Sequence, residues 1–273
     1  MGRNYYYLIA GLADLSFDDG KAPYTLESFR EDVCSGVSAV DRRILDLLPL
    51  EDDCRALVQV LEGKADDARL QELIDAAKAE EKCPDAFPQF MYDFVCEYVT
   101  DSWQDRAAFA SDRLLGMFYE YAMGRKNAFI HDWYAFNLDL NNIQAAFTAR
   151  KYGLDIQKLV VGDTEVAQAL RVSGARDWGL TGVVTCFDDI ARLQDEQDLA
   201  QRERKTDMLR WNWLEENTFF HYFSIERLFS YMVRLGMVQR WLSLDRESGQ
   251  QLFRQLIGGL KGQVEVPAEF GNN

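Results

Sequence analysis

The sequence predicts an all-α protein built from several helical bundles, with little or no sheet. Apolar residues recur at helical spacing along most of the 273 residues, and capping residues stand at the ends of the periodic segments. Only the stretches 5–10 and 183–186 are typical of strands, which is too few for a sheet. Hydrophobic residues make up 48% of the chain and charged residues 27%, the balance of a folded protein.

The first helices are marked by their caps. Thr25 caps a helix that runs to about Cys34, and Ser38, with Asp41 three residues later, begins a second helix that ends before Pro49. Within 65–82, the Asp residues come early and the Lys residues late, which suits the helix dipole. Four apolar residues of that segment share one stripe: Leu70, Leu73, Ile74 and Ala77.

The rest of the chain continues this pattern. Further helices are expected over 90–99, 101–123, 126–152, 187–242 and 248–260. The stretch 153–184 contains several glycines and is the expected loop or hinge region. We therefore divide the chain into an acidic N-terminal bundle, 1–124, a C-terminal bundle with an aromatic-rich helix, 125–262, and a flexible tail, 263–273. The two bundles can also pack as one domain.

The charge is strongly negative and unevenly distributed. The formal net charge is −15, so the chain lacks the basic surface of a nucleic-acid-binding protein. Residues 1–136 hold 14 Lys and Arg against 26 Asp and Glu, a balance of −12, whereas residues 137–273 hold 16 against 19, a balance of −3. The near-neutral C-terminal half is therefore the better candidate for a contact surface.

The sequence predicts a cytoplasmic protein. The N-terminus lacks the apolar core of a signal peptide, and no stretch approaches the roughly 18 apolar residues of a membrane span. The five cysteines are odd in number and include no CxxC pair, which favours free thiols in a reducing compartment. Association with a membrane would then require a protein partner.

Motifs of catalysis and cofactor binding are missing from the sequence. It contains no phosphate-binding loop, calcium loop, GxSxG or GxGxxG, and neither His131 nor His221 has a second histidine at metal-ligand spacing. Asp132 follows His131, but adjacent helix positions do not face each other. The mixed-charge run 195–207 is interpreted as a solvated helix. We expect no cofactor, no metal and no enzymatic activity.

Two other classes of function stay open. Several carboxylates occur at helical spacing and would suit a metal-dependent helical enzyme: Asp93, Glu97, Asp101 and Glu120. On an acidic helix, the same spacing is also that of a solvated stripe. The second alternative is a helical module that binds a ligand in a pocket formed by the aromatic residues of 211–241.

A line of polar residues runs along the helix expected over 126–152. Arg150 lies eleven positions after Asp139 and only about 20° around the helix, and Asn142 lies about 60° from Asp139. An unpaired buried polar group costs roughly 1–3 kcal/mol, so these residues need partners in a neighbouring helix or loop. Gly153 follows at a left-handed C-cap position. We predict a structural role for the three residues.

The segment 211–241 is unusually aromatic. It contains nine aromatic residues in 31 positions, where the chain average of 13% would give about four. One stripe of it is a regular core stripe, but other aromatic residues fall around the whole circumference of the expected helix, and these are the candidate partner contacts: Trp211, Trp213, Phe219, Phe220, Tyr222 and Phe223. Such a helix is either central in the core or packs a partner on its second face.

The sequence resembles a bacterial family encoded beside V-type ATPase genes, itself similar to the C (d) subunit of V/A-type rotary ATPases. The resemblance rests on the opening phrase NYYYLIAGLAD (4–14), on Asp139–Leu154 with its Asp-x-x-Asn and Arg-Lys-Tyr-Gly-Leu elements, and on the aromatic segment. It implies an all-helical, non-catalytic central-stalk adaptor that couples the soluble rotor shaft to the membrane rotor ring in ion transport. Its partners would be other ATPase subunits, at the inner face of the membrane. The chain is shorter than a C subunit and shows no clear threefold repeat.

Overall fold

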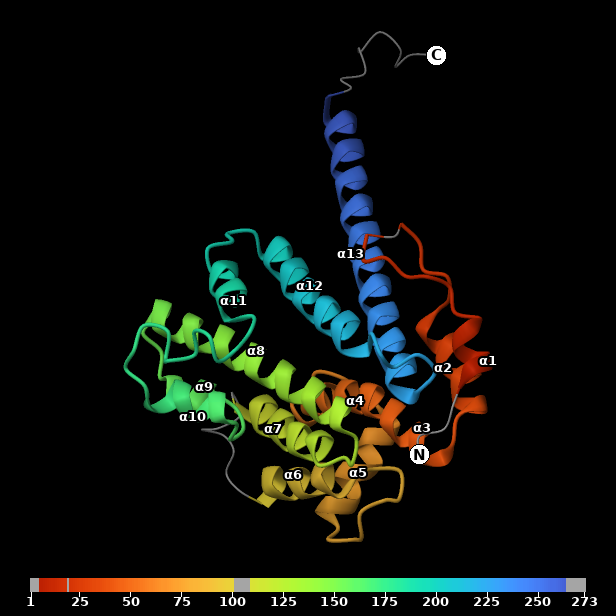
Figure 1. The fold of residues 1–273 in the computed structure, drawn as a ribbon, viewed down its shortest axis with the longest axis vertical. Coiled ribbons are helices and arrows are strands. Elements are labelled where there is room, and N and C mark those ends of the chain that lie inside the picture. Colours follow the sequence, from red (N-terminus) through yellow and green to blue (C-terminus); the bar gives the residue numbers. More distant parts are fainter. Residues whose placement is uncertain (1–4, 19, 101–108, 264–273) are drawn as a thin grey trace, which may run out of the picture.

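The computed structural model of the protein describes residues 5–18, 20–100 and 109–263, with side chains described as far as residue 245. The regular elements of this part are all helices, and its one β-type contact is an isolated bridge between Thr181 and Val184 (Figure 1). The expected all-α class is therefore confirmed. None of the described helices has the length and apolar content needed to cross a lipid bilayer.

Thirteen helices make up the described part of the chain. In order they are α1 (Tyr6–Ala10), α2 (Leu26–Gly36), α3 (Ala39–Leu45), α4 (Leu47–Leu61), α5 (Ala68–Lys78), α6 (Gln89–Thr100), α7 (Ala110–Met123), α8 (Ala128–Tyr152), α9 (Ile156–Leu159), α10 (Glu165–Val172), α11 (Phe187–Leu193), α12 (Leu199–Thr218) and α13 (Ile225–Gln263).

Short polar side chains begin several of these helices, two of them as the sequence predicts. The Thr25 hydroxyl accepts a hydrogen bond from the Ser28 amide (3.1 Å), and the Ser38 hydroxyl accepts one from the Asp41 amide (3.2 Å). At the other end of α8, Gly153 adopts φ 67°, the left-handed conformation expected of it. Each of these bonds or turns satisfies a backbone group that a helix end leaves unpaired.

Several local expectations were wrong. The segment 153–184, expected to be a loop or hinge, contains α9 and α10. Residues 6–10 form α1 rather than a strand. A helix over Leu47–Leu61 was not expected, because Pro49 was interpreted as a stop signal; instead Pro49 lies in the first turn of α4. A proline is tolerated there, since the first amides of a helix have no partner within the helix.

The helices enclose two hydrophobic cores that share α8. The larger core takes buried side chains from α2 to α8, α12 and α13, and within it the rings of Phe118 on α7 and Tyr134 on α8 lie 5.3 Å apart. The smaller core lies between the second half of α8 and the segment 160–190, around Ile143, Trp178 and Ile190. The larger core thus holds residues from both sides of the expected boundary at 124.

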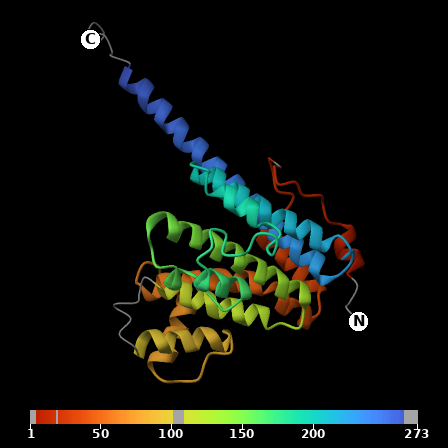
Figure 2. The ribbon, with the colours of Figure 1, turned by 60° about the vertical axis from the view of Figure 1, so that its left-hand side comes forward.

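Helices α12 and α13 form a hairpin beside the bundle. Both ribbon views show α12 beside the first half of α13, while the second half of α13 projects beyond the rest of the molecule (Figures 1 and 2). At 1.5 Å per residue, the 39 residues of α13 span on the order of 60 Å. Of the expected tail, Gln263 ends α13 and the remainder lies outside the described residues.

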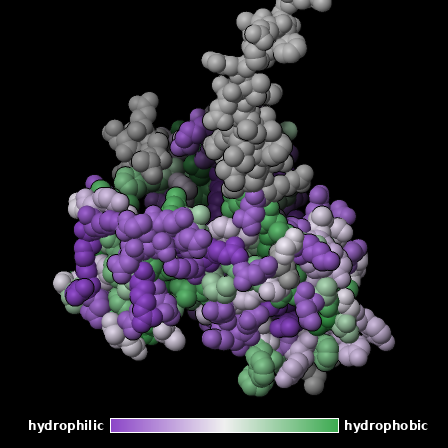
Figure 3. Space-filling view, turned by 90° about the horizontal axis from the view of Figure 1, so that it is seen from above, coloured by the Kyte–Doolittle hydropathy of each residue, from purple (hydrophilic) through white to green (hydrophobic). Residues whose placement is uncertain are grey.

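The face of the molecule toward which α13 projects is mostly hydrophilic. Apart from the atoms drawn in grey, purple groups dominate that view, and green groups occur in smaller areas between them (Figure 3). Exposed aromatic side chains are instead concentrated at the other end of α13, in the turn that joins it to α12.

Candidate functional site

The aromatic segment is a helical hairpin rather than one helix. α12 ends at Thr218 and α13 begins at Ile225, so the segment contains a turn at 219–224. Trp211 is buried and contacts Phe17 with ring centroids 5.4 Å apart. Trp213 is partly buried and stacks on Phe136 at 5.4 Å. These two tryptophans therefore belong to the core. The aromatic residues seemed to fall around the whole circumference of one helix because the chain turns at 219–224 and continues as a second helix.

The remaining four residues occupy the turn. Phe219, Phe220 and Tyr222 are exposed, whereas Phe223 is half-buried. Phe223 connects the turn to α1: its carbonyl accepts a hydrogen bond from the Tyr5 amide (2.7 Å), and its ring lies 4.8 Å from that of Tyr6. The turn and α1, more than 200 positions apart in the chain, are therefore neighbours.

Together, α1 and the turn expose five aromatic side chains, which we call the aromatic patch: Tyr6, Tyr7, Phe219, Phe220 and Tyr222. Their exposed fractions range from 53% to 93%. Exposed apolar side chains are ordinary when they are scattered, but a cluster of rings is typical of a protein contact surface, because aromatic residues contribute strongly to binding. Of the six candidate contact residues, three are therefore exposed in this patch: Phe219, Phe220 and Tyr222. The other two members of the patch are tyrosines of α1.

The polar line on α8 contacts the segment 153–184, which contains α9 and α10. Asn142 forms a reciprocal pair of hydrogen bonds with the backbone of Val161: its Nδ2 donates to the carbonyl and its Oδ1 accepts from the amide, both at 2.8 Å. Asp139 accepts a hydrogen bond from the Thr164 hydroxyl (2.7 Å). Burial raises the pKa of Asp139, and this hydrogen bond opposes the rise.

Arg150 binds the same segment further along. Its guanidinium donates to the carbonyls of Ala175 (3.0 Å) and Arg176, and it lies over the Trp178 ring at 3.7 Å from the centroid. Asp139, Asn142 and Arg150 therefore each contact a different part of residues 161–178. All three are well placed for the structural role that the sequence predicts.

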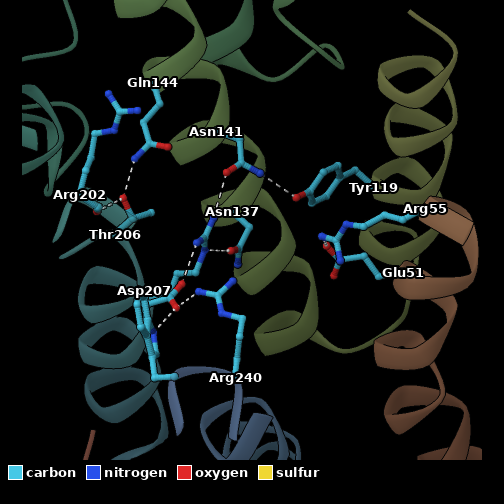
Figure 4. A network of polar contacts seen from close by, with 12 residues as sticks. Glu51, Arg55, Tyr119, Asn137, Asn141, Gln144, Arg202, Thr206, Asp207 and Arg240 are labelled. Carbon is cyan, nitrogen blue, oxygen red and sulfur yellow. Dashed lines mark hydrogen bonds and ion pairs between the residues drawn. The ribbon is translucent and has the colours of Figure 1, made fainter. Parts of the chain in front are cut away.

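A second polar network joins the hairpin to the bundle, and it was not among the features expected from the sequence. Asp207 on α12 is only 2% exposed, although it lies in the run interpreted as a solvated helix. Its carboxylate accepts hydrogen bonds from the indole Nε1 of Trp241 (2.9 Å), from Arg210 (3.1 Å) and from Arg240. The interpretation of the run was therefore wrong at its C-terminal end. In Figure 4, a dashed line joins Asp207 of α12 to Arg240 of α13.

Arg210 extends this network to α8. Its Nε donates to Oδ1 of Asn137 (2.9 Å), and its Nη2 donates to Oδ1 of Asn141 (3.0 Å). The Nδ2 of Asn141 in turn donates to the Tyr119 hydroxyl on α7 (3.2 Å; Figure 4). The network thus crosses from α13 through α12 and α8 to α7. Because each of its charges has a partner, it fixes the position of the hairpin on the bundle.

A cavity of about 510 Å3 lies beside the network. α4 contributes Glu51 and Arg55, whose side chains lie across from Asn141 in Figure 4 and form an ion pair at 2.6 Å. Burial raises the pKa of Glu51, and the positive charge of Arg55 opposes the rise. Asp207 and Arg210 also line this cavity, and both bind other residues of the network.

Of the four carboxylates considered for a metal-dependent enzyme, two contact protein partners and Glu120 is exposed at the surface. Glu97 forms an ion pair with Arg113 (2.9 Å), and Asp93 accepts a hydrogen bond from Gln89 (2.8 Å). Asp101 lies outside the described residues. Within the described part of the chain, no group of three His, Cys, Asp or Glu side chains is placed to hold a metal ion.

The histidines lie at the surface, and one expectation about them was wrong. His131 Nδ1 lies 3.0 Å from Oδ1 of Asp132, although the two residues are adjacent on α8. The contact forms because both side chains are exposed and can turn toward each other. His221, in the aromatic turn, lies 3.7 Å from Glu226. Neither histidine contacts the Asp207 network.

Comparison with known proteins places the chain in one family. The family model described as "Protein of unknown function (DUF2764)" matches residues 2–264. The chain belongs to this family. The matched residues include both hydrophobic cores, the polar line, the Asp207 network and the aromatic patch. No curated protein and no solved structure matches the chain.

Proposed function

We propose that this protein is a non-catalytic adaptor subunit in the central stalk of a V/A-type rotary ATPase, where it couples the soluble rotor shaft to the membrane rotor ring. The resemblance of the opening phrase, of Asp139–Leu154 and of the aromatic segment to the family encoded beside V-type ATPase genes supports this assignment. The all-helical fold agrees with it, since the C (d) subunit is also all-helical.

The observation that carries the proposal is the layout of α13. The aromatic patch lies beside the N-terminal end of this helix, and its C-terminal half projects beyond the body of the molecule (Figures 1 and 2). One continuous helix therefore connects the aromatic patch with a segment that extends beyond the body, and under this proposal a partner binds at each of the two. An adaptor that transmits rotation needs this arrangement, because its two contacts must move as one rigid body.

The buried polar contacts suit a stiff connector. Asp207 links α12 and α13 to each other, and Arg210 links them to α8. A hairpin held only by apolar packing would also be stable, but directional bonds between charged groups fix its position more narrowly. Under this proposal the network keeps the projecting helix at a constant angle to the bundle.

The aromatic patch would be one of the two partner contacts. Its residues come from α1 and from the near-neutral C-terminal half of the chain. Its rings offer apolar surface that a partner can cover without burying a charge. Binding through such a patch resists salt, whereas any attraction between the acidic N-terminal half and a basic partner would weaken as salt is added.

Affinity purification of the tagged native protein from detergent-solubilised cells tests the proposal. We expect rotary ATPase subunits to copurify with the wild type and to be partly or wholly lost from the double variant Phe219→Ser/Phe220→Ser. The matched control is Val172→Ser/Val183→Ser, which removes two exposed apolar side chains away from the patch. If the wild type brings no ATPase subunit with it, the proposal is wrong.

A further inference from the structure

Four arginines meet at one cavity in the most acidic half of the chain. The cavity, of about 650 Å3, is open to the surface and takes its arginines from four separate elements: Arg30 from α2, Arg43 from α3, Arg69 from α5 and Arg125 from the turn after α7. Residues 1–136 contain only 14 basic residues in all. The fold therefore brings four of them to one cavity from positions that are spread over 96 residues.

Two of these arginines are neutralised by carboxylates that line the same cavity. Arg30 pairs with Asp46 at 3.1 Å, and Arg69 donates two hydrogen bonds to Asp53, one of them at 2.9 Å. Arg43 and Arg125 form no ion pair with any carboxylate in the part of the chain that the structure describes. The third carboxylate of the wall, Asp85, forms an ion pair with Lys82 at 3.3 Å. The guanidinium groups of Arg43 and Arg125 are therefore the two at this wall that no carboxylate pairs with.

The guanidinium of Arg125 is held in place by groups that leave most of its donors unused. It lies 3.7 Å from the centroid of the Tyr121 ring, and its Nε donates to the Tyr121 carbonyl (3.3 Å). Arg69 lies in a similar way over Phe87, at 5.5 Å. An arginine that is already stacked on a ring loses little conformational freedom when it binds an anion, which favours binding.

We propose that this cavity binds a small organic phosphate monoester. Two unpaired guanidinium groups match the charge of a phosphate monoester near neutral pH, about −1.5 to −2. The phosphorus of a monoester carries three terminal oxygens, so two guanidinium groups can each bind to them. A carboxylate has only two oxygens to offer. The apolar part of the wall, with Leu47, Leu50, Phe87 and Pro88, can accept the organic group.

Isothermal titration calorimetry of the full-length protein with phenyl phosphate tests this site. We expect saturable binding to one site, and binding of phenyl sulfate weaker by about fivefold or more, because phenyl sulfate carries a single charge. Arg43→Gln and Arg125→Gln should each weaken the binding of phenyl phosphate by about tenfold or more. Arg43 is exposed, so its variant tests the site without disturbing the core.

Two neighbouring residues provide matched controls. Arg42 and Lys126 stand next to Arg43 and Arg125 in the chain but do not line this cavity. Arg42→Gln and Lys126→Gln remove the same charge and should change the affinity by less than about twofold. Three results would overturn the proposal: no saturable binding of phenyl phosphate, equal binding of phenyl sulfate, or control variants that weaken binding as strongly as the site variants.

Discussion

The indole Nε1 of Trp241 donates a hydrogen bond of 2.9 Å to the carboxylate of Asp207, and this contact joins α13 to α12 within the protein interior. The same carboxylate also binds Arg210 and Arg240. One buried acidic residue therefore contributes three contacts that hold the projecting helix in position. In an adaptor built on this fold, Asp207 helps to determine how the two ends of the molecule are held relative to each other.

Removal of this carboxylate should destabilise the protein strongly. We expect Asp207→Ala to lower the free energy of unfolding by about 3 kcal/mol, because it leaves two arginines and an indole without their partner. Urea denaturation followed by circular dichroism measures the change. The control is Asp189→Ala, which breaks the exposed ion pair with Arg192 and should cost less than about 0.5 kcal/mol. Equal losses in the two variants would show that the network adds no special stability.

Asn142 should be the most important residue of the polar line. Asn142→Ala leaves the amide and the carbonyl of Val161 unpaired, so we expect a loss of about 2–3 kcal/mol in the free energy of unfolding. The amide of Val161 should also exchange its hydrogen faster. Asn217 makes a single hydrogen bond at the surface, and Asn217→Ala should have little effect. A Val161 amide that remains protected in Asn142→Ala would contradict this prediction.

The two other residues of the line should contribute less. We expect Asp139→Ala and Arg150→Ala each to lower the free energy of unfolding by roughly 1–3 kcal/mol, since each removes a partner of the segment 153–184. Limited proteolysis should cut that segment sooner in both variants than in the wild type. Unfolding at the wild-type midpoint in both variants would mean that these side chains are merely a solvated face.

Stability should depend on pH through Glu51. Burial raises its pKa, so the folded protein binds a proton more readily than the unfolded chain does. The contribution of Glu51 to stability is therefore greatest below the ordinary carboxyl pKa of about 4.3 and falls as the pH rises through the raised value. The free energy of unfolding of the wild type, minus that of Glu51→Gln, should decrease between about pH 4 and pH 7. An increase over this range would mean that Arg55 outweighs burial.

The aromatic patch should matter for binding and not for folding. Phe220 is 80% exposed, so Phe220→Ser should change the free energy of unfolding by less than about 0.5 kcal/mol. Phe229, in the first turns of α13, is fully buried, and Phe229→Ser should cost about 3–5 kcal/mol or prevent folding. Thermal unfolding of both variants measures the contrast. Similar losses in the two would show that the patch is part of the core.

Local signals along the sequence were sufficient to predict most of the helices. Thr25, Ser38 and Gly153 act on the few backbone groups next to them, and the structure confirms all three. Pro49 is a misleading signal, since a proline that stops one helix can equally stand in the first turn of the next. The turn at 219–224 contains neither Gly nor Pro, so nothing in its composition marked the break between α12 and α13.

The candidate sites were harder to predict, because they depend on contacts between distant residues. Asp207 belongs to a charged run, and only its contacts with Trp241 and Arg240, more than 30 positions away, make it a buried residue. The pairing of α1 with the aromatic turn likewise joins Tyr5 to Phe223. One signal was present in the sequence: Arg210 stands three positions after Asp207, on the same helix face.

Deletion of the gene, followed by measurement of ATP hydrolysis and ion pumping in membrane vesicles, tests the adaptor role most directly. This role predicts that the soluble head continues to hydrolyse ATP while ATP-driven ion pumping is lost, and that the wild-type gene restores pumping. A deletion strain whose ATPase pumps ions at the wild-type rate per ATP hydrolysed would contradict it.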